Sequence, residues 1–428
     1  MFLIYYIFLP SKNLLYIPII IFVFLILKYI NINKNNLFYI FKNLKIQKKI
    51  NYKTLSTISI NLANLIWRIF FFVLLEKEYS GILFSVFAIM SFPSSLYSNT
   101  IGMLLETQNK ASWVPSGGLS AHPKVDLATG ELMFFNYSKH APFLNYGVVD
   151  KNQNLKHFVP IELPGPRLPH DMAFSKNYSI INDLPLFWDQ EMLKKGVHAT
   201  RLHDLPSRFA VIPRYGNPED IQWFEADPTY VLHWNNAYEV GDELILEGYF
   251  QEHPWPENYI DAPPGLERMM AFLDFSLLKP RLHRWKFNLK TGVTSEEDID
   301  DATIEFGVIN QHVAGVEHRY TYSMIPTKGH FTFDGLTKFD HHSKSSSKYV
   351  FEDHVFISEV SFAPRTDSTD EDDGYLVTIS NDVKEKSSAC LLFDAKNIEH
   401  GPVCEIPLPH HICSGTHATW AQKNELTK

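Results

Sequence analysis

From about Asn99 onward the sequence consists of short extended segments, and this pattern most restricts the folds that the chain can adopt. The segments are rich in β-branched and aromatic residues, and turn signals containing Gly, Pro, Asn or Asp separate them. Clear examples are ELMFFNY (131–137), RFAVIPRY (208–215), ELILEGYF (243–250), HRWKFNL (283–289) and YLVTIS (375–380). Many short strands of this kind are typical of sandwiches, barrels and propellers, and this region is too long for one sandwich. We therefore predict an all-β propeller, with a short helix or a loop over one face at 263–278.

The composition supports a sizeable folded core and argues against a nucleic-acid surface. Of the 428 residues, 45% are hydrophobic and 14% are aromatic, and the formal net charge is −9. Because a protein that binds nucleic-acid backbones needs a basic face, we expect no nucleic-acid partner. The three cysteines form no CxxC pair and are too few for a disulfide scaffold. Their scarcity favours a reducing compartment.

Residues 1–95 differ from the rest, so we divide the chain into a segment 1–95 and a propeller domain 96–428. The first segment is crowded with Ile, Leu, Phe, Tyr, Asn and Lys. Its stretch 13–30 is apolar over nearly the ~20 residues that span a bilayer, and Lys-rich sequence follows it. Two interpretations remain open: a single-pass membrane anchor at 13–30, or sequence translated from AT-rich non-coding DNA. We accordingly expect a cytoplasmic or a membrane-associated protein.

The segment 230–250 reads as two strands around the turn EVGDE, but the first strand ends in an unexpected polar run. Tyr230–Trp234 is predicted to be extended, and it leads through His233 directly into Asn235 and Asn236. A strand that enters a core would not ordinarily end in an imidazole and two amides. This polar run therefore requires a functional or a structural explanation.

Three other histidines share the context of His233 at the edge of an extended segment with small or apolar neighbours. They are His122 in SAHPKVDL, His170 in RLPHDMAF and His417 in SGTHATW. The four are 48, 63 and 184 residues apart, so they fit no helical or zinc-finger spacing. Distant histidines can still meet if each lies at the inner edge of a different propeller blade, and imidazole suits Fe, Cu, Ni and Zn. Spacing alone does not establish such a site.

Eight segments, in order over about residues 97–420, resemble the carotenoid cleavage dioxygenase family, which includes lignostilbene dioxygenases and the retinoid isomerase of the eye. They are AHPKVDLATGEL, HDMAFSKNY, PSRFAVIPRYG, HWNNAYE, DDATIEFGVIN with HRYTYS, EDDGYLVTI, LLFDAKNIEHGPV and LPHHICSGTHATW. The resemblance implies a seven-bladed β-propeller with a non-haem Fe(II) on its axis. It also implies that His122, His170, His233 and His417 bind the iron.

The resemblance also implies carboxylates that hydrogen-bond the ligand imidazoles. Glu305 and Glu359 match two of these positions, and Glu106 is expected to match the third. Such partners fix the tautomer of a ligating histidine. Nearby, Glu239 is predicted to be a structural hydrogen-bonding residue, and Asn235 and Asn236 are predicted to satisfy backbone groups.

The implied activity is cleavage of a carbon–carbon double bond by O2, which gives two carbonyl products from a carotenoid, apocarotenoid or stilbene. The expected partners are thus O2 and a lipophilic small molecule in an apolar tunnel, with membrane association as a further expectation. The candidate tunnel residues are Phe174, Trp234, Phe306 and Trp420, although core packing is the competing interpretation for each. The alternatives are an isomerohydrolase that uses the same ligands and a non-catalytic propeller.

The chain departs from the family pattern at its front. The family's RNGPNP and HWFDGDGM signatures are not found, and the apolar segment stands in their place. We therefore expect the first blade to be incomplete or replaced. An open ring exposes unpaired strand edges, so we also expect low stability or low activity.

Overall fold

The computed structural model describes residues 114–115, 117–188, 200–202, 205–254, 273–329, 331–366, 368–412 and 415–421. All of them belong to one compact unit, Tyr79–Lys428. The prediction of a membrane anchor at 13–30 and the prediction for Glu106 lie outside the described residues. Among the described residues, no helix has the length and apolar character needed to cross a bilayer.

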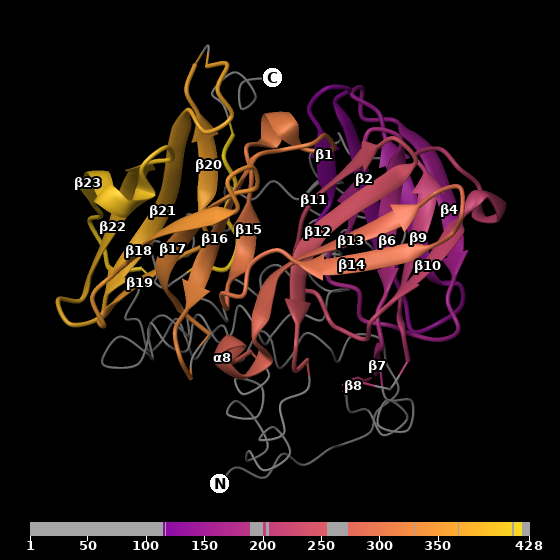
Figure 1. Cartoon of the computed structure of the whole chain (residues 1–428), viewed down its shortest axis with the longest axis horizontal. Coiled ribbons are helices and arrows are strands. Elements are labelled where there is room, and N and C mark those ends of the chain that lie inside the picture. Colours follow the sequence, from indigo (N-terminus) through magenta and orange to yellow (C-terminus); the bar gives the residue numbers. More distant parts are fainter. Residues whose placement is uncertain are drawn as a thin grey trace, which may run out of the picture. The chain divides into compact units, whose positions relative to one another are not determined.

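Three antiparallel sheets of four strands occupy the first half of this unit (Figure 1). The first sheet, in the order β1-β2-β3-β4, contains Lys124–Asp126, Glu131–Tyr137, Phe143–Val149 and Leu155–Glu162. The second, in the order β10-β9-β6-β5, contains Gln222–Ala226, Ser207–Pro213, Tyr178–Asp183 and Ala173–Phe174. The third, in the order β11-β12-β13-β14, contains Trp234–Val240, Glu243–Gln251, Pro280–Asn288 and Thr294–Asp298.

The second half contains a nine-stranded sheet made of two more four-stranded units. One unit contains β15 (Glu305–Val308), β16 (Tyr320–Pro326), β17 (Phe333–Asp340) and β18 (Ser345–Val350). The other contains β20 (Ser361–Pro364), β21 (Gly374–Asp382), β22 (Ser387–Asp394) and β23 (Pro402–Pro407), and β19 (Val355–Ile357) joins the two. The remaining elements are β7 (Leu186–Trp188), β8 (Thr200–Leu202), α8 (Phe275–Leu278), η2 (Pro218–Asp220), η4 (Gln311–Val313) and η5 (Ile398–His400).

Five antiparallel units of four strands confirm the predicted all-β class and are the repeating element of a propeller. The count of seven blades and the incomplete first blade stay predictions, since residues 1–113 are outside the described part. For 263–278 the prediction was a short helix or a loop, and the described end of that segment contains the four-residue helix α8. The turn EVGDE joins β11 to β12, where Gly241 has a φ of 60° that suits glycine.

The predicted start of one strand is wrong. Residues 230–233 are not in a strand, and β11 begins only at Trp234. The backbone N–H of Trp234 donates to the Asp171 side chain at 2.9 Å, and the pairing of β11 with β12 is irregular between Trp234 and Asn236. Regular pairing with β12 therefore starts at Trp234, and residues 230–233 lead up to β11 without strand pairing.

Aromatic and aliphatic side chains from facing sheets form the cores between them. Phe209 of β9 lies 5.8 Å from both Trp234 and Trp285, which belong to the third sheet. A second cluster joins the first and second sheets and includes Phe135 and Tyr146, both fully buried. Burial of such side chains contributes about 1.5–3 kcal/mol each, so these clusters fix the sheets against one another.

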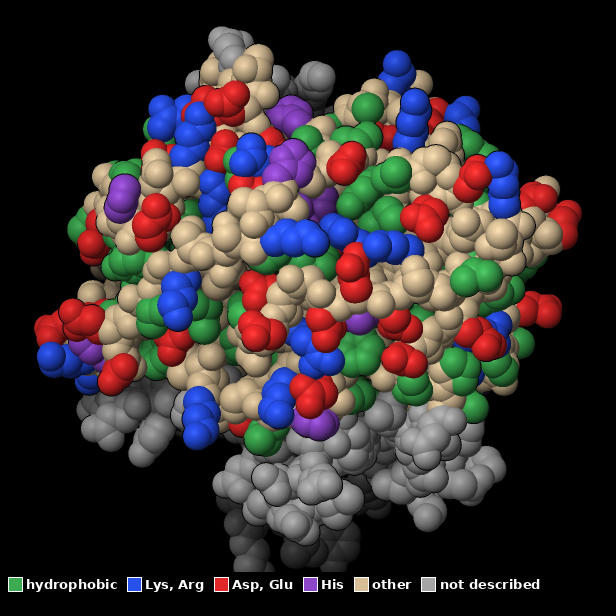
Figure 2. Space-filling model, in the orientation of Figure 1, with side chains coloured by type: hydrophobic (Ala, Val, Ile, Leu, Met, Phe, Trp, Pro, Cys, Tyr) green, Lys and Arg blue, Asp and Glu red, His purple; other side chains and the backbone are tan. Residues whose placement is uncertain are grey.

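The outer surface carries both signs of charge. Figure 2 shows acidic and basic side chains interspersed across the face in view. Neighbouring strands pair some of them directly, as Lys286 of β13 does with Glu297 of β14 at 2.7 Å. Cross-strand pairs of opposite charge stabilise a sheet by roughly 0.2–1 kcal/mol.

A buried ion cluster joins the first sheet to the second. The Arg214 guanidinium contacts Asp126 at 2.6 Å, Glu131 at 2.9 Å and the Ser175 carbonyl at 3.0 Å. Arg214 is only 7% exposed. Burial raises the pKa of Asp126, but the hydrogen bond and charge of Arg214 and the hydrogen bonds from Ala128 and Thr129 together lower that pKa by more, so the carboxylate stays charged.

Replacing Arg214 by Ala is expected to lower the free energy of unfolding by about 3–5 kcal/mol, because it leaves Asp126 charged and buried without its partner. Urea unfolding of the full chain measures this change. Arg319→Ala is the matched control, since Arg319 pairs with Asp340 at 2.7 Å at the exposed surface and should cost far less. Equal losses for the two variants would contradict the stabilising role of the buried cluster.

Candidate metal centre

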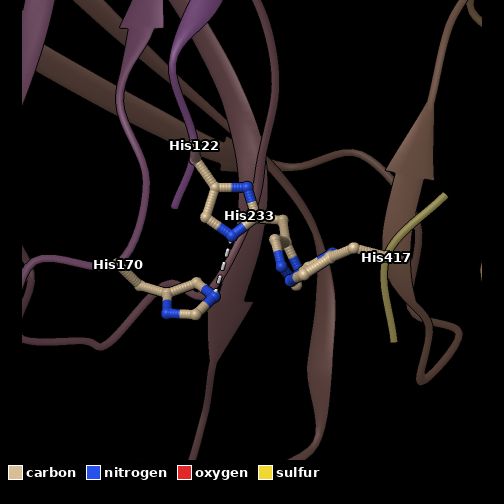
Figure 3. Close-up of side chains that lie close together, drawn as sticks. All are labelled: His122, His170, His233 and His417. Carbon is tan, nitrogen blue, oxygen red and sulfur yellow. Dashed lines mark hydrogen bonds between the residues drawn. The ribbon is translucent and has the colours of Figure 1, made fainter. Parts of the chain in front are cut away.

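Four histidines from widely separated segments meet at one point (Figure 3). They are His122, His170, His233 and His417, and their ligating nitrogens all lie within 4.8 Å of one another. The ring centroids are between 4.7 and 6.5 Å apart. The structure thus brings together all four histidines that the sequence singles out.

The positions of these histidines in the fold explain their convergence. His122, His170 and His233 each come one to three residues before β1, β5 and β11, and each of these is an edge strand of its own four-stranded sheet. His417 lies in the segment that follows β23. Corresponding edges of neighbouring sheets therefore deliver one imidazole each, as expected for the inner edges of propeller blades.

Burial favours the neutral form of two of the four rings, His122 and His170. Burial holds the pKa of His122 far below its ordinary value, and the nearby His233 and Lys124 lower it further. Burial also holds the pKa of His170 well below its ordinary value. A neutral imidazole has a free lone pair, which is the form that binds a metal ion.

Glu305 orients His233. The Nδ1–H of His233 donates to Glu305 Oε2 at 2.8 Å, and this carboxylate also accepts the backbone N–H of Phe306. Burial lowers the pKa of His233, but the charge and the hydrogen bond of Glu305, with the charges of Asp171 and Glu359, together raise it by more, so the net pKa is raised. With its proton held on Nδ1, His233 presents the Nε2 lone pair to the other three rings.

Glu359 has the same relation to His417, in a more exposed setting. His417 Nδ1 lies 3.2 Å from Glu359 Oε2, and the side chain of His417 is 45% exposed. Two of the three predicted carboxylate partners thus stand beside predicted ligands. Their roles at a bound metal stay predictions, as does the whole role of Glu106.

Two features of the cluster fit a metal ion. His233 Nε2 is buried and accepts no hydrogen bond from any described residue. His122 Nε2 and His170 Nε2 are 3.1 Å apart, within hydrogen-bond distance, so these two ring nitrogens face each other at the centre of the cluster. The donor set of four neutral imidazoles suits a first-row transition metal.

The candidate tunnel residues fall into different surroundings. The Phe306 ring lies 4.4 Å from His233 and 6.0 Å from His417, so it borders the cluster. Phe174 and Trp234 belong to the cores between sheets, which agrees with the core-packing interpretation. Trp420 is 48% exposed. The tunnel itself stays a prediction.

Two of the three neighbouring polar residues, Glu239 and Asn236, have the structural roles predicted for them. Glu239 accepts hydrogen bonds from Ser175 Oγ at 2.6 Å and from the backbone of Asn177 at 2.9 Å. The Asn236 amide bonds the backbone of residues 315 and 316. Asn235 differs from the prediction, because its amide donates to a side chain, Thr321 Oγ1, at 2.8 Å.

A second group of histidines and a carboxylate escaped the sequence analysis. Glu247, His318 and His341 are close enough to hold an ion. However, His318 Nδ1 lies 3.0 Å from the Asn236 amide nitrogen and His341 Nδ1 lies 3.3 Å from an Arg284 nitrogen. Both Nδ1 atoms therefore accept, and both Nε2 atoms carry protons that a metal would displace. The group is a hydrogen-bond network, in which burial lowers the pKa of His318 to about 4.

Comparisons with known proteins agree with this geometry. Residues 97–422 match the family model described as retinal pigment epithelial membrane protein. The chain is 33% identical over 329 residues to the carotenoid 9,10(9′,10′)-cleavage dioxygenase 1 of Pisum sativum. The alignment covers 72% of this chain and 58% of that protein. It is 27% identical over 342 residues to the isoeugenol monooxygenase of Pseudomonas putida. That alignment covers 75% of this chain and 70% of that protein.

The fold is likewise shared with a solved enzyme. The lignostilbene dioxygenase of Pseudomonas brassicacearum superposes with a TM-score of 0.63 at 24% identity and covers 74% of this chain and 68% of that one. The chain spans less than two thirds of the length of the pea dioxygenase. The family match over 97–422 and the identity to the pea enzyme show that the chain belongs to the family of the retinal pigment epithelial membrane protein and the carotenoid cleavage oxygenases.

Proposed function

We propose that this protein is a non-haem Fe(II) dioxygenase that cleaves a carbon–carbon double bond of a carotenoid, apocarotenoid or stilbene-type substrate. The observation that carries the proposal is the convergence of four imidazoles on one point, with carboxylates behind two of them. The printed activities of the related proteins support it, since they are named as carotenoid-cleaving and isoeugenol oxygenases and a lignostilbene dioxygenase. In this proposal residues 96–428 form the catalytic domain.

His122, His170, His233 and His417 would hold the iron, and Glu305 and Glu359 would keep two of them in the ligating tautomer. When bound, Fe(II) supplies the activation of O2, and one alkene plus one O2 gives two carbonyl compounds. Four neutral ligands would leave the full +2 charge of the ion available for that chemistry.

The apolar surroundings of the cluster suit a lipophilic substrate. Phe306 lies beside His233, and it packs against Phe333 at 5.0 Å and Phe331 at 6.1 Å. Such a wall excludes water and contacts a flat conjugated chain over a large area. A substrate that partitions into lipid would also favour association of the protein with a membrane surface.

The test uses the full chain, loaded with Fe(II) under anaerobic conditions and then given 18O2 with an apocarotenal or a hydroxystilbene. We expect two carbonyl products, each carrying one 18O. Turnover without uptake of O2 would instead indicate an isomerohydrolase. Failure of the purified chain to bind iron would favour a non-catalytic propeller, and either result would overturn the proposal.

A further inference from the structure

Asp171 is a buried carboxylate that contacts three of the histidine-bearing segments at once. It follows His170 directly and is 1% exposed. Its oxygens accept the backbone N–H of Met172 at 2.7 Å and that of Trp234 at 2.9 Å. The Lys124 ammonium lies 2.8 Å from Oδ1 and 3.0 Å from Oδ2.

Each of these donors lies next to a predicted iron ligand in the sequence. Trp234 is the residue after His233, and Lys124 is two residues after His122. The three segments enter three different sheets through β11, β1 and β5. The Asp171 carboxylate therefore links the three segments that carry His122, His170 and His233 into three different sheets.

The Trp234 N–H donates to Asp171 at the residue where β11 begins. Trp234 is paired with Gly248 of β12, and the register shifts between Trp234 and Asn236. A buried N–H without an acceptor would cost about 1–3 kcal/mol. The first residue of β11, and with it His233, is thus fixed by the carboxylate.

The buried charge makes this arrangement cooperative. A carboxylate is stable in a buried site only if donors and a cation compensate it, and here the donors come from three separate segments. If one segment moves away, the anion loses part of its compensation. The two side chains of the pair formed by Asp171 and Lys124 compensate each other's charge at 2.8 Å.

Asp171 is not itself a candidate ligand. Both of its oxygens are engaged by N–H groups, and the metal-holding group that contains His170 consists of the four histidines alone among the described residues. The Asp171 carbonyl accepts the Asn182 amide at 2.7 Å, which anchors it to β6. The carboxylate is therefore held in place independently of any ion.

We propose that Asp171 is a positioning residue that presets His122, His170 and His233 for metal binding. The inference rests on the proposed iron site, and it adds the residue that holds three of the ligand-bearing segments in place. Removal of outer partners of metal ligands typically weakens metal affinity about 10–100-fold. We expect a loss of that size for Asp171→Ala.

The experiment measures Co2+ binding by the full chain through the visible absorption of the bound ion, which reports both affinity and ligand geometry. Asp171→Ala should raise the Co2+ dissociation constant by about 10–100-fold and change the spectrum. Asp171→Asn should lose less, because its amide oxygen still accepts the Trp234 N–H. Lys124→Met removes only the ion pair between Asp171 and the His122 segment. The Lys124 side chain is 24% exposed, so this variant should fold and should show a smaller loss of Co2+ affinity.

Glu247→Gln is the matched control, because Glu247 is also a fully buried carboxylate paired with a cation, Arg284 at 2.6 Å. It should leave Co2+ affinity and spectrum unchanged. If Asp171→Ala binds Co2+ as tightly as the wild type, only the positioning role is wrong. An equal loss of Co2+ affinity in Glu247→Gln would likewise contradict only the positioning role. A wild-type chain without a Co2+ band would contradict the metal site itself, and the inference with it.

Discussion

Replacing His233 by Ala is expected to abolish stoichiometric iron binding and, with it, oxidative cleavage. His233 is the most enclosed predicted ligand with a carboxylate partner, and its Nε2 atom has no competing hydrogen bond among the described residues. The substitution removes one of the four proposed ligands and leaves Glu305 fully buried without its imidazole. The loss in metal affinity should exceed the about 10–100-fold typical of losing an outer partner.

Iron per chain after desalting, together with O2 consumption, measures this effect. His354→Ala serves as the control, because His354 lies at the surface between Glu352 and Asp382, away from the cluster. It should bind iron as the wild type does. A His233→Ala protein that folds and retains one tightly bound iron per chain would show that the ligand assignment is wrong.

Replacing Glu305 by Gln is expected to weaken metal binding by about tenfold, and replacing it by Ala by up to about 100-fold. Glutamine can still accept the His233 Nδ1–H through its carbonyl oxygen, but it lacks the negative charge. Because Glu305 raises the pKa of His233, its removal also makes that ring a poorer base and so a weaker ligand. The alanine variant loses both the acceptor and the charge.

Glu359→Gln is the matched comparison for this prediction. Its hydrogen bond to His417 is longer, 3.2 Å against 2.8 Å, and solvent reaches the His417 side chain. Solvent screening weakens such a pair, so Glu359→Gln should reduce affinity less than Glu305→Gln. Competition with a chelator gives the two dissociation constants, and the reverse order would contradict the importance of the buried pair.

The aromatic wall beside His233 bears on substrate choice. Phe306 has a φ of 57°, in the left-handed region that bulky residues seldom adopt, and its ring lies against His233. Backbone conformations of this kind cost about 1–3 kcal/mol and persist where the surrounding structure enforces them. This conformation places an apolar ring against His233, at the border of the histidine cluster.

Local sequence determined the class of fold. Alternation of apolar and polar residues and the chemistry of turns act over a few neighbouring residues, so the strands at 131–137, 243–250 and 375–380 could be predicted directly. The predicted hairpin between β11 and β12 forms for the same reason. The predicted strand start near His233 was wrong: β11 begins at Trp234, whose N–H donates to Asp171, a residue 63 positions away that local sequence does not indicate.

The four histidines could be named from the sequence, but only through the resemblance of their motifs to a known family. Their spacings carry no signal of a common site, since the sheets that join them form through contacts between distant residues. Asp171 and the network of Glu247, His318 and His341 were missed for that reason. Sequence by itself determined which side chains can bind a metal, whereas the packing of separate sheets decided which of them meet, which are held neutral and which carboxylates hold them.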